Sequence, residues 1–321
     1  MQPDNSIESL PLATDGLHAA VDKARESLNG IILGKDREVA LSLACLLGRG
    51  HLLIEDLPGL GKTMLAQSLA KVLGLSYQRI QFTSDLLPAD IIGVSIFQQA
   101  SGKFVFQPGP VFTQLVLADE INRATPKAQS ALLEAMEERQ VSVDGETYAL
   151  PEPYFVVATQ NPSDQVGTFP LPESQLDRFL MRIEMGYPSE EHERELITGE
   201  DRRTLLQNVS ATLNPDVLIQ LQNAIREVRL SDPLVDYIQA LVRFTRESPD
   251  IETGLSPRGS QALALAARSL AFIEHHNGVY PDDVQAVFAA CASHRLKPAS
   301  NSTYRRPDEI CRHVLDNVAI P

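Results

Sequence analysis

Short apolar runs alternate with helical periodicities over the first half of the chain. Residues 51–55 form an apolar run directly before a glycine-rich turn, and Leu65, Leu69, Val72 and Leu73 then restore a helical spacing. Three more strand-like runs follow at residues 77–82, 114–118 and 154–159, and each ends in polar residues. This alternation predicts a parallel α/β sheet whose strands deliver polar side chains to one edge.

Helices and hairpins fill the intervals between these runs. Apolar residues recur at helical spacing over residues 16–28 and again from Val39 to Leu47, while Thr125 and Pro126 are typical of a helix start. Residues 141–150 turn at Asp144-Gly145, which predicts a hairpin. A second hairpin is expected over residues 94–106, with its turn near residues 100–102. Both hairpins would project from the sheet.

Beyond residues 186–188 the pattern is helical, and we expect no strand there. Helices are predicted at 190–206, 214–229, 233–247, 257–275 and 281–293, with a short one after Pro307. The expected organisation is a flexible tail at 1–14, an α/β domain at 15–187 and an all-helical domain at 188–321.

Composition narrows the class of protein. Lys and Arg number 28 against 42 Asp and Glu, and this net charge of −14 argues against a nucleic-acid-binding surface. No apolar run reaches the roughly 18 residues of a membrane span, and the first residues lack a secretory leader. The three cysteines are far apart and match no metal-ligand spacing, so we expect a reducing, cytoplasmic location.

The strongest local motif is Asp56-Leu57-Pro58-Gly59-Leu60-Gly61-Lys62-Thr63. It fits the phosphate-binding pattern G-x-x-x-x-G-K-[ST] except at Asp56, a residue that tolerates unusual backbone angles and whose carboxylate should point away from a nucleotide. Lys62 would reach the β- and γ-phosphates, and the Thr63 hydroxyl would bind Mg²⁺. The alternative, a plain glycine turn capping a helix, is disfavoured by the strand before it and the helix after it.

Two further strand ends complete a candidate site. Residues 115–118 are apolar and lead into Asp119, suited to hold Mg²⁺, and Glu120, suited to polarise an attacking water. Residues 158–162 end a strand at Asn161, which should lie beside Asp119 and orient water or contact the γ-phosphate. On its own the Asn161-Pro162 pair is equally well explained as a turn.

These motifs together resemble the MoxR family of AAA+ ATPases over about residues 15–320. The resemblance rests on residues 58–63, 118–124, 129–138, 158–162, 176–179 and 256–258, of which the block 119–138 is the most diagnostic. It implies an AAA+ P-loop domain with flanking helices, a helix-2 insertion and a pre-sensor-1 hairpin, followed by a helical lid domain. It also implies assembly into a ring, commonly of six subunits.

The resemblance assigns roles by position. Asn161 corresponds to sensor 1, Arg178 to the arginine that reaches a neighbour's γ-phosphate, and Arg258 to sensor 2 on the lid. From the residues alone, Arg178 could equally pair with Asp177, and Arg258 could simply begin a helix. The nucleotide-binding set implied by the resemblance is Ile32, Leu33, Gly34, Pro58, Gly59, Leu60, Gly61, Lys62, Thr63, Met64 and Arg258.

The expected activity is Mg²⁺-dependent hydrolysis of ATP to ADP and phosphate, coupled to remodelling or maturation of a protein client. The resemblance implies a protein client, often one with a von Willebrand factor A domain. The lack of a long apolar run leads us to expect no direct insertion of the chain into a membrane. Two alternatives stay open: an ATPase motor on nucleic acid, against which the acidic charge weighs, and a scaffold that binds nucleotide without hydrolysing it. Glu120, Asn161 and Arg178 together argue against the scaffold.

Overall fold

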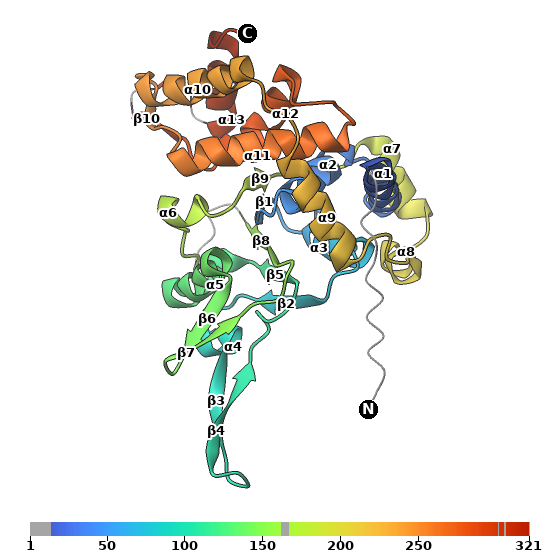
Figure 1. The fold of residues 1–321 in the computed structure, drawn as a ribbon, viewed down its shortest axis with the longest axis vertical. Helices are drawn as coiled ribbons and strands as arrows, with labels where there is room; N and C mark the ends of the chain where they lie inside the picture. Colours follow the sequence, from blue (N-terminus) through green and yellow to red (C-terminus); the bar gives the residue numbers. More distant parts are fainter. Residues whose placement is uncertain (1–13, 162–166, 301, 305, 321) are drawn as a thin grey trace.

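A computed structural model of the chain describes residues 14–161, 167–300, 302–304 and 306–320. Its centre is a five-stranded sheet in the order β2-β5-β8-β1-β9, in which all neighbouring pairs are parallel. Figure 1 shows the sheet between the helical part of the chain and a long projecting hairpin. The strands are β1 (Leu52–Glu55), β2 (Tyr77–Gln81), β5 (Leu115–Asp119), β8 (Phe155–Gln160) and β9 (Met181–Ile183).

The two faces of the sheet belong to two separate cores because successive strand residues point to opposite sides. Leu117 and Val157 join the core that contains α1 (Thr14–Ile31), α2 (Asp36–Leu47) and α3 (Lys62–Val72). Val116 and Ala158 join the core that contains α4 (Pro88–Ile92) and α5 (Pro126–Glu138). Every residue of β5 and β8 is therefore buried, as their continuous apolar sequences predict.

Both predicted hairpins are present. One consists of β3 (Gly93–Gln98) and β4 (Lys103–Pro108), and the other of β6 (Gln140–Val143) and β7 (Glu146–Ala149). Asp144 and Gly145 both have positive φ, as a tight two-residue turn requires. The hairpins touch at their bases, where the Phe106 and Tyr148 rings stack with centroids 4.1 Å apart.

The second half of the chain is helical, with two departures from the prediction. The helix expected at 190–206 is two helices, because Gly199 ends the first by donating its N–H to Glu195. The expectation of no strand is also wrong, since β10 (Ile251–Thr253) pairs antiparallel with β11 (Lys297–Pro298). The helices are α7 (Glu190–Thr198), α8 (Arg202–Asn208), α9 (Pro215–Arg226), α10 (Asp232–Glu247), α11 (Pro257–Ile273), α12 (Pro281–Ala292) and α13 (Pro307–Asn317).

Very short elements escaped the sequence analysis. They are α4, the single turn η1 (Ile121–Arg123), α6 (Glu173–Leu176) and the three-residue strand β9. None is long enough to show a period, and tertiary contacts set their conformation. Thr125 takes the N-cap position of α5 as expected, although its side chain makes no capping hydrogen bond.

Two further expectations concern the ends and length of elements. The predicted tail lies outside the described residues except for Thr14, at which α1 begins. Of the helices that the structure describes, none is both long enough and apolar enough to cross a membrane.

Candidate active site

The glycine-rich loop between β1 and α3 has the geometry of a phosphate cradle. Gly59 and Gly61 adopt left-handed φ values of 88° and 86°. A β-carbon placed on either residue would have no other atom within 4 Å, so the space beside the loop is open. The start of α3 carries neither a capping side chain nor an acidic residue. An anion is thus the partner that the positive end of α3 fits best, and the loop residues suit a nucleotide phosphate.

Asp56, which replaces the first glycine of the phosphate-loop pattern, binds backbone N–H groups on the side of the loop away from the cavity. Its Oδ1 accepts from the Leu57 N–H at 2.7 Å and its Oδ2 from the Gly186 N–H at 2.6 Å. The carboxylate is therefore directed at the backbone of the loop and of the segment before the helical region, not at the cavity. Asp56 does not need the unusual backbone angles that it could tolerate, because the positive φ values of the loop fall on Gly59 and Gly61.

Lys62 is buried at the start of α3 and points at the ends of the neighbouring strands. Its Nζ donates to the carbonyl oxygens of Asp56 and Leu57 and, at 3.1 Å, to Asn161 Oδ1. Burial lowers the pKa of Lys62, while the charges of Asp56, Asp119 and Glu120 act in the opposite direction. A phosphate on the loop would supply the negative charge that best holds this ammonium group.

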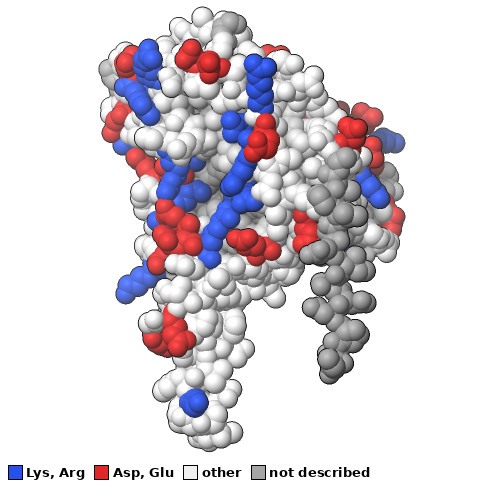
Figure 2. Space-filling view, in the orientation of Figure 1, with Lys and Arg blue, Asp and Glu red and all other residues white. Residues whose placement is uncertain are grey.

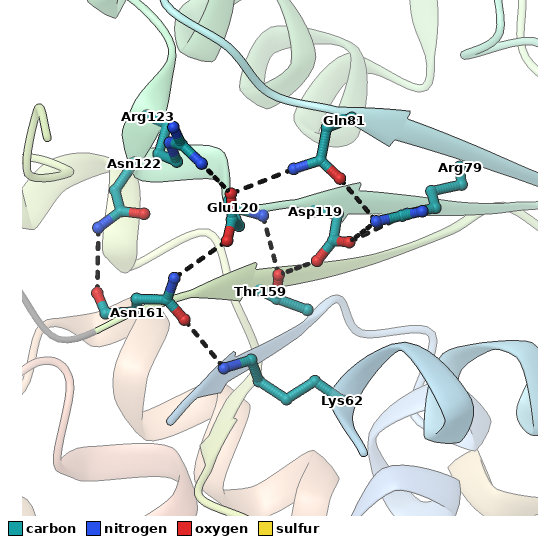
Figure 3. A network of polar contacts seen from close by, with 9 residues as sticks. All are labelled: Lys62, Arg79, Gln81, Asp119, Glu120, Asn122, Arg123, Thr159 and Asn161. Carbon is teal, nitrogen blue, oxygen red and sulfur yellow. Dashed lines mark hydrogen bonds and ion pairs between the residues drawn. The ribbon is translucent and has the colours of Figure 1, made fainter. Parts of the chain in front are cut away.

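Glu120 stands at the end of β5 in a strained conformation, with φ of +56°. Its Oε1 accepts from Asn161 Nδ2 at 3.1 Å, and its Oε2 accepts from Arg123 at 2.8 Å and from Gln81 at 3.2 Å (Figure 3). Donors from β2, η1 and the end of β8 therefore fix this carboxylate. Asn161 links Glu120 to Lys62 across the edge of the sheet.

Asp119 is held by two residues from the adjacent strands. Its Oδ1 accepts from the Thr159 hydroxyl at 2.6 Å, and its Oδ2 accepts from Arg79 at 2.6 and 3.0 Å (Figure 3). Arg79, Gln81 and Thr159 had no role in the sequence analysis. Arg79 and Gln81 alternate along β2, which indicates that they share one face of the strand but does not identify their acidic partners. Thr159 lies in β8, within the motif that ends at Asn161.

The ion pair between Arg79 and Asp119 predicts a measurable competition with Mg²⁺. If Asp119 holds the metal, Arg79→Gln should lower the Mg²⁺ concentration for half-maximal ATP hydrolysis about two- to fivefold, since partly exposed pairs contribute at most about 1 kcal/mol. A Mg²⁺ titration of the phosphate-release rate measures it. Arg203→Gln removes a charge from the same cavity without touching Asp119, so an equal shift in that control would contradict the competition.

A cavity of about 860 Å³ gathers most of the predicted site residues. It runs from the glycine loop along α3 to Tyr77 and to Arg203 of α8. The predicted residues that line it are Pro58, Gly59, Gly61, Lys62, Thr63, Met64, Asp119, Glu120 and Asn161. Leu60 instead packs against the hydrophobic core.

The segment Ile32-Leu33-Gly34 does not line this cavity. Gly34 has a φ of +63°, and the ring of His192 occupies the space where a side chain would begin. The next residue, Lys35, donates to the Tyr187 carbonyl at 2.9 Å. The residue after this segment therefore contacts Tyr187, and Asp56 of the loop contacts the preceding residue, Gly186.

Arg178 and Arg258 do not line the cavity, and the two side chains lie next to each other. Leu180 donates to the carbonyl of His51, so Arg178 sits beyond the amino ends of β1 and β9, while Lys62 follows the carboxyl end of β1. A four-residue strand spans roughly 13 Å, which separates Arg178 from its own phosphate loop. Both arginines pair with Glu137.

The pairing of Arg178 with Asp177, the alternative left open by the sequence, does not occur. Asp177 pairs instead with Arg295 at 2.6 Å. Arg178 therefore has an acceptor on α5 and not on its own loop.

The parallel sheet, the glycine cradle at the start of α3 and the acidic strand end define a P-loop ATPase with a helical lid. Comparisons with known proteins agree with this class. Residues 51–181 match the model of the ATPase family associated with various cellular activities, and residues 243–314 match that of the AAA lid domain. The chain belongs to the MoxR family of AAA+ ATPases.

Individual relatives cover nearly the whole chain. It is 44% identical over 96% of its length to the uncharacterized protein YeaC of Bacillus subtilis, of which 97% is covered. It is 40% identical over 98% of its length to Chaperone MoxR1 of Mycobacterium tuberculosis, of which 86% is covered. A crystal structure of a candidate ATPase from Cytophaga hutchinsonii, 35% identical, superposes with a TM-score of 0.86 over 96% of this chain and 97% of that one.

Proposed function

We propose that this MoxR-family protein hydrolyses Mg²⁺-bound ATP to ADP and phosphate and uses the cycle to remodel or mature a protein client. The observation that supports it best is the position of Asn161, which contacts Lys62 at 3.1 Å and Glu120 at 3.1 Å. A phosphate-binding ammonium and a water-polarising carboxylate are thereby held one side chain apart. That spacing suits attack of a water molecule on a terminal phosphate.

Each residue of the cavity has a distinct part in this proposal. Lys62 exchanges its carbonyl acceptors for β- and γ-phosphate oxygens, and Thr63 and Asp119 hold Mg²⁺, whose charge stabilises the phosphate oxygens. Asn161 then contacts the γ-phosphate or the attacking water. Glu120, released from Asn161, polarises that water.

The proposal also assigns residues that would contact the adenine and ribose of ATP. We assign Ile32, Leu33 and Gly34 to the adenine side and Met64 to the wall next to the phosphates, with Pro58 and Leu60 shaping the loop. The support is that Lys35, next to Gly34, donates to the Tyr187 carbonyl, while the neighbouring Gly186 N–H donates to Asp56 in the loop. We place the division between the ATPase domain and the lid domain at this point, after residue 187.

Arg178 and Arg258 are assigned to the active site of a neighbouring subunit in a ring, of six subunits by family resemblance. The support is their position beyond the amino ends of the strands, on Glu137, whereas the phosphate loop lies at the carboxyl ends. A residue on that side of the sheet can meet a phosphate only if a second copy brings its own loop to it.

The client is proposed to be a protein, and one relative in the comparison is named a chaperone. The hairpin β3–β4 offers it a surface, since the tilted rings of Phe97 and Phe104 lie with their centroids 5.3 Å apart and are 52% and 71% exposed. Figure 2 shows the end of this projection almost free of charge. A von Willebrand factor A domain in the client is carried over from the resemblance, as is the cytoplasmic location, with which three unpaired cysteines agree.

Lys62→Ala tests the proposed function directly. Loss of charge-assisted hydrogen bonds to phosphate should weaken ATP binding about 10- to 100-fold and abolish phosphate release. Calorimetric titration with ATP and a phosphate-release assay measure the two effects. Lys23→Ala, on the exposed side of α1, is the matched control. Unchanged binding and turnover in Lys62→Ala would overturn the nucleotide site.

Shortening the hairpin tip at residues 100–103 should leave basal ATP hydrolysis within about twofold, because the tip has no contact with the cavity. It should weaken binding of an unfolded model protein, such as a reduced and alkylated globular domain, measured by fluorescence anisotropy. The alternative is that the hairpin serves the stability of the molecule, through the contacts of Phe97 with Phe104 and of Phe106 with Tyr148. A large fall in melting temperature with unchanged binding would favour that alternative.

A further inference from the structure

One carboxylate joins the two arginines that the sequence placed in different roles. Arg178 Nη2 lies 3.0 Å from Glu137 Oε2, and Arg258 Nη2 pairs with Oε1 of the same group. Arg178 precedes β9, Arg258 belongs to the first turn of α11, and Glu137 lies in the last turn of α5. The ATPase domain and the lid thus meet at Glu137.

The arrangement has a simple electrostatic reason. Two guanidinium groups side by side repel each other, and a carboxylate that gives one oxygen to each offsets the repulsion. Arg178 is held further by the Leu133 carbonyl, to which its Nη1 donates. Its Nε is buried and has no hydrogen-bond partner within the described part of the chain. The two guanidinium groups are therefore held in a fixed orientation, and Arg178 still has a hydrogen-bond donor that is free to bind a further group.

We propose that Glu137 is a positioning residue that presents Arg178 and Arg258 as one unit to the phosphates of the neighbouring subunit; this rests on the trans role proposed above. Both arginines keep N–H groups that Glu137 does not occupy, because each guanidinium has five. Glu137 acts through the arginines and contacts no phosphate itself. Without its charge the two arginines separate and reach the neighbour singly.

The competing interpretation is structural: the pair between Glu137 and Arg258 merely holds α11 of the lid on α5. The two interpretations differ in which subunit needs Glu137. A structural role is required in every subunit, whereas a positioning role is required only in the subunit that donates the arginines.

Glu137→Gln keeps the shape of the side chain and removes its charge. In the full-length protein it should lower kcat for ATP hydrolysis about tenfold and change KM less than about twofold. Glu138→Gln, one residue further along α5 and outside both ion pairs, is the matched control and should keep the kcat of the wild type. Equal rates for Glu137→Gln and wild type would overturn the proposal.

Mixed assemblies give the decisive readout. Lys62→Ala subunits donate arginines and Arg178→Ala subunits offer intact pockets, so their mixture should regain hydrolysis. Adding Glu137→Gln to the Lys62→Ala chain should lower the regained rate about tenfold, whereas adding it to the Arg178→Ala chain should not change it. An equal effect on both chains, or on neither, overturns the positioning role.

The same experiment distinguishes a failure of the Glu137 proposal from a failure of the trans role of Arg178, on which it rests. If the two parent variants form mixed assemblies, seen by native mass spectrometry, yet regain no activity, the trans role of Arg178 fails, and Glu137 loses its function with it. If they regain activity and Glu137→Gln shows no asymmetry, the trans role survives and only the role of Glu137 is refuted.

Discussion

An Arg178→Ala protein should bind ATP with close to wild-type affinity and hydrolyse it at least about a thousandfold more slowly. The reason is geometric: Arg178 precedes β9 at the amino ends of the strands, so its loss leaves the phosphate loop of its own subunit intact. In the proposed ring, what disappears is the charge that Arg178 would offer to a neighbour's γ-phosphate. Calorimetry for binding and steady-state phosphate release for hydrolysis separate the two quantities.

Two variants sharpen this prediction. Arg178→Lys should recover little activity, because an ammonium lacks the planar fork of a guanidinium. Arg194→Ala, on the exposed face of α7, removes an arginine with no part in the site and should behave as wild type. Mixing Arg178→Ala with Lys62→Ala should restore part of the rate at interfaces that join an intact pocket to an intact arginine. Mixed assemblies without recovery would assign Arg178 to its own subunit or to the fold alone.

Glu120→Gln should bind ATP as tightly as the wild type but lose hydrolysis by a factor of about 100 or more. The amide has the same shape as the carboxylate, and its single oxygen can still accept from Arg123 and Gln81 where Oε2 does, while the hydrogen bond from Asn161 to Oε1 is lost. Without the negative charge the side chain cannot polarise water. The strained φ of +56° at Glu120 fits such a role, because strain of this kind concentrates at functional positions. Binding and phosphate release are measured as above.

The control for Glu120→Gln is Glu26→Gln, the same chemical change on the exposed side of α1. It should leave both binding and hydrolysis unchanged. Equal hydrolysis by wild type and Glu120→Gln would refute the assignment of Glu120 as the residue that activates water. Loss of ATP binding by Glu120→Gln would instead show that the side chain is needed to hold the nucleotide.

The glycine loop and the strand ends were predictable because their signals are local. Gly59 and Gly61 are required by backbone angles that other residues avoid, and Lys62 follows at the start of a helix that its own sequence forms. Asp119 and Asn161 end buried strands that run parallel, so their meeting at one edge of the sheet followed from the strand pattern alone. The five strands alternate with helices in the order that such a sheet requires.

Other contacts depend on which strands become neighbours. Arg79 reaches Asp119, and Gln81 reaches Glu120, only because β2 pairs with β5 in the register that sets Gln81 opposite Asp119. Nothing in the sequence around residue 79 indicates that partner. Strands as short as β9 and β10 are likewise set by the chain they pair with, because three residues show no period.

The sequence by itself determined the phosphate loop, the acidic and amide strand ends, the helices and the class of ATPase, because residues close along the chain produce each of these. Only the tertiary structure decided that Arg178 and Arg258 share Glu137, although Glu137 and Arg258 are 121 residues apart. Their meeting depends on how the lid packs into the core that it shares with α1, α2 and α3, on the other face of the sheet from the core of α5. That packing sums many weak apolar contacts between distant segments, and no single motif encodes it.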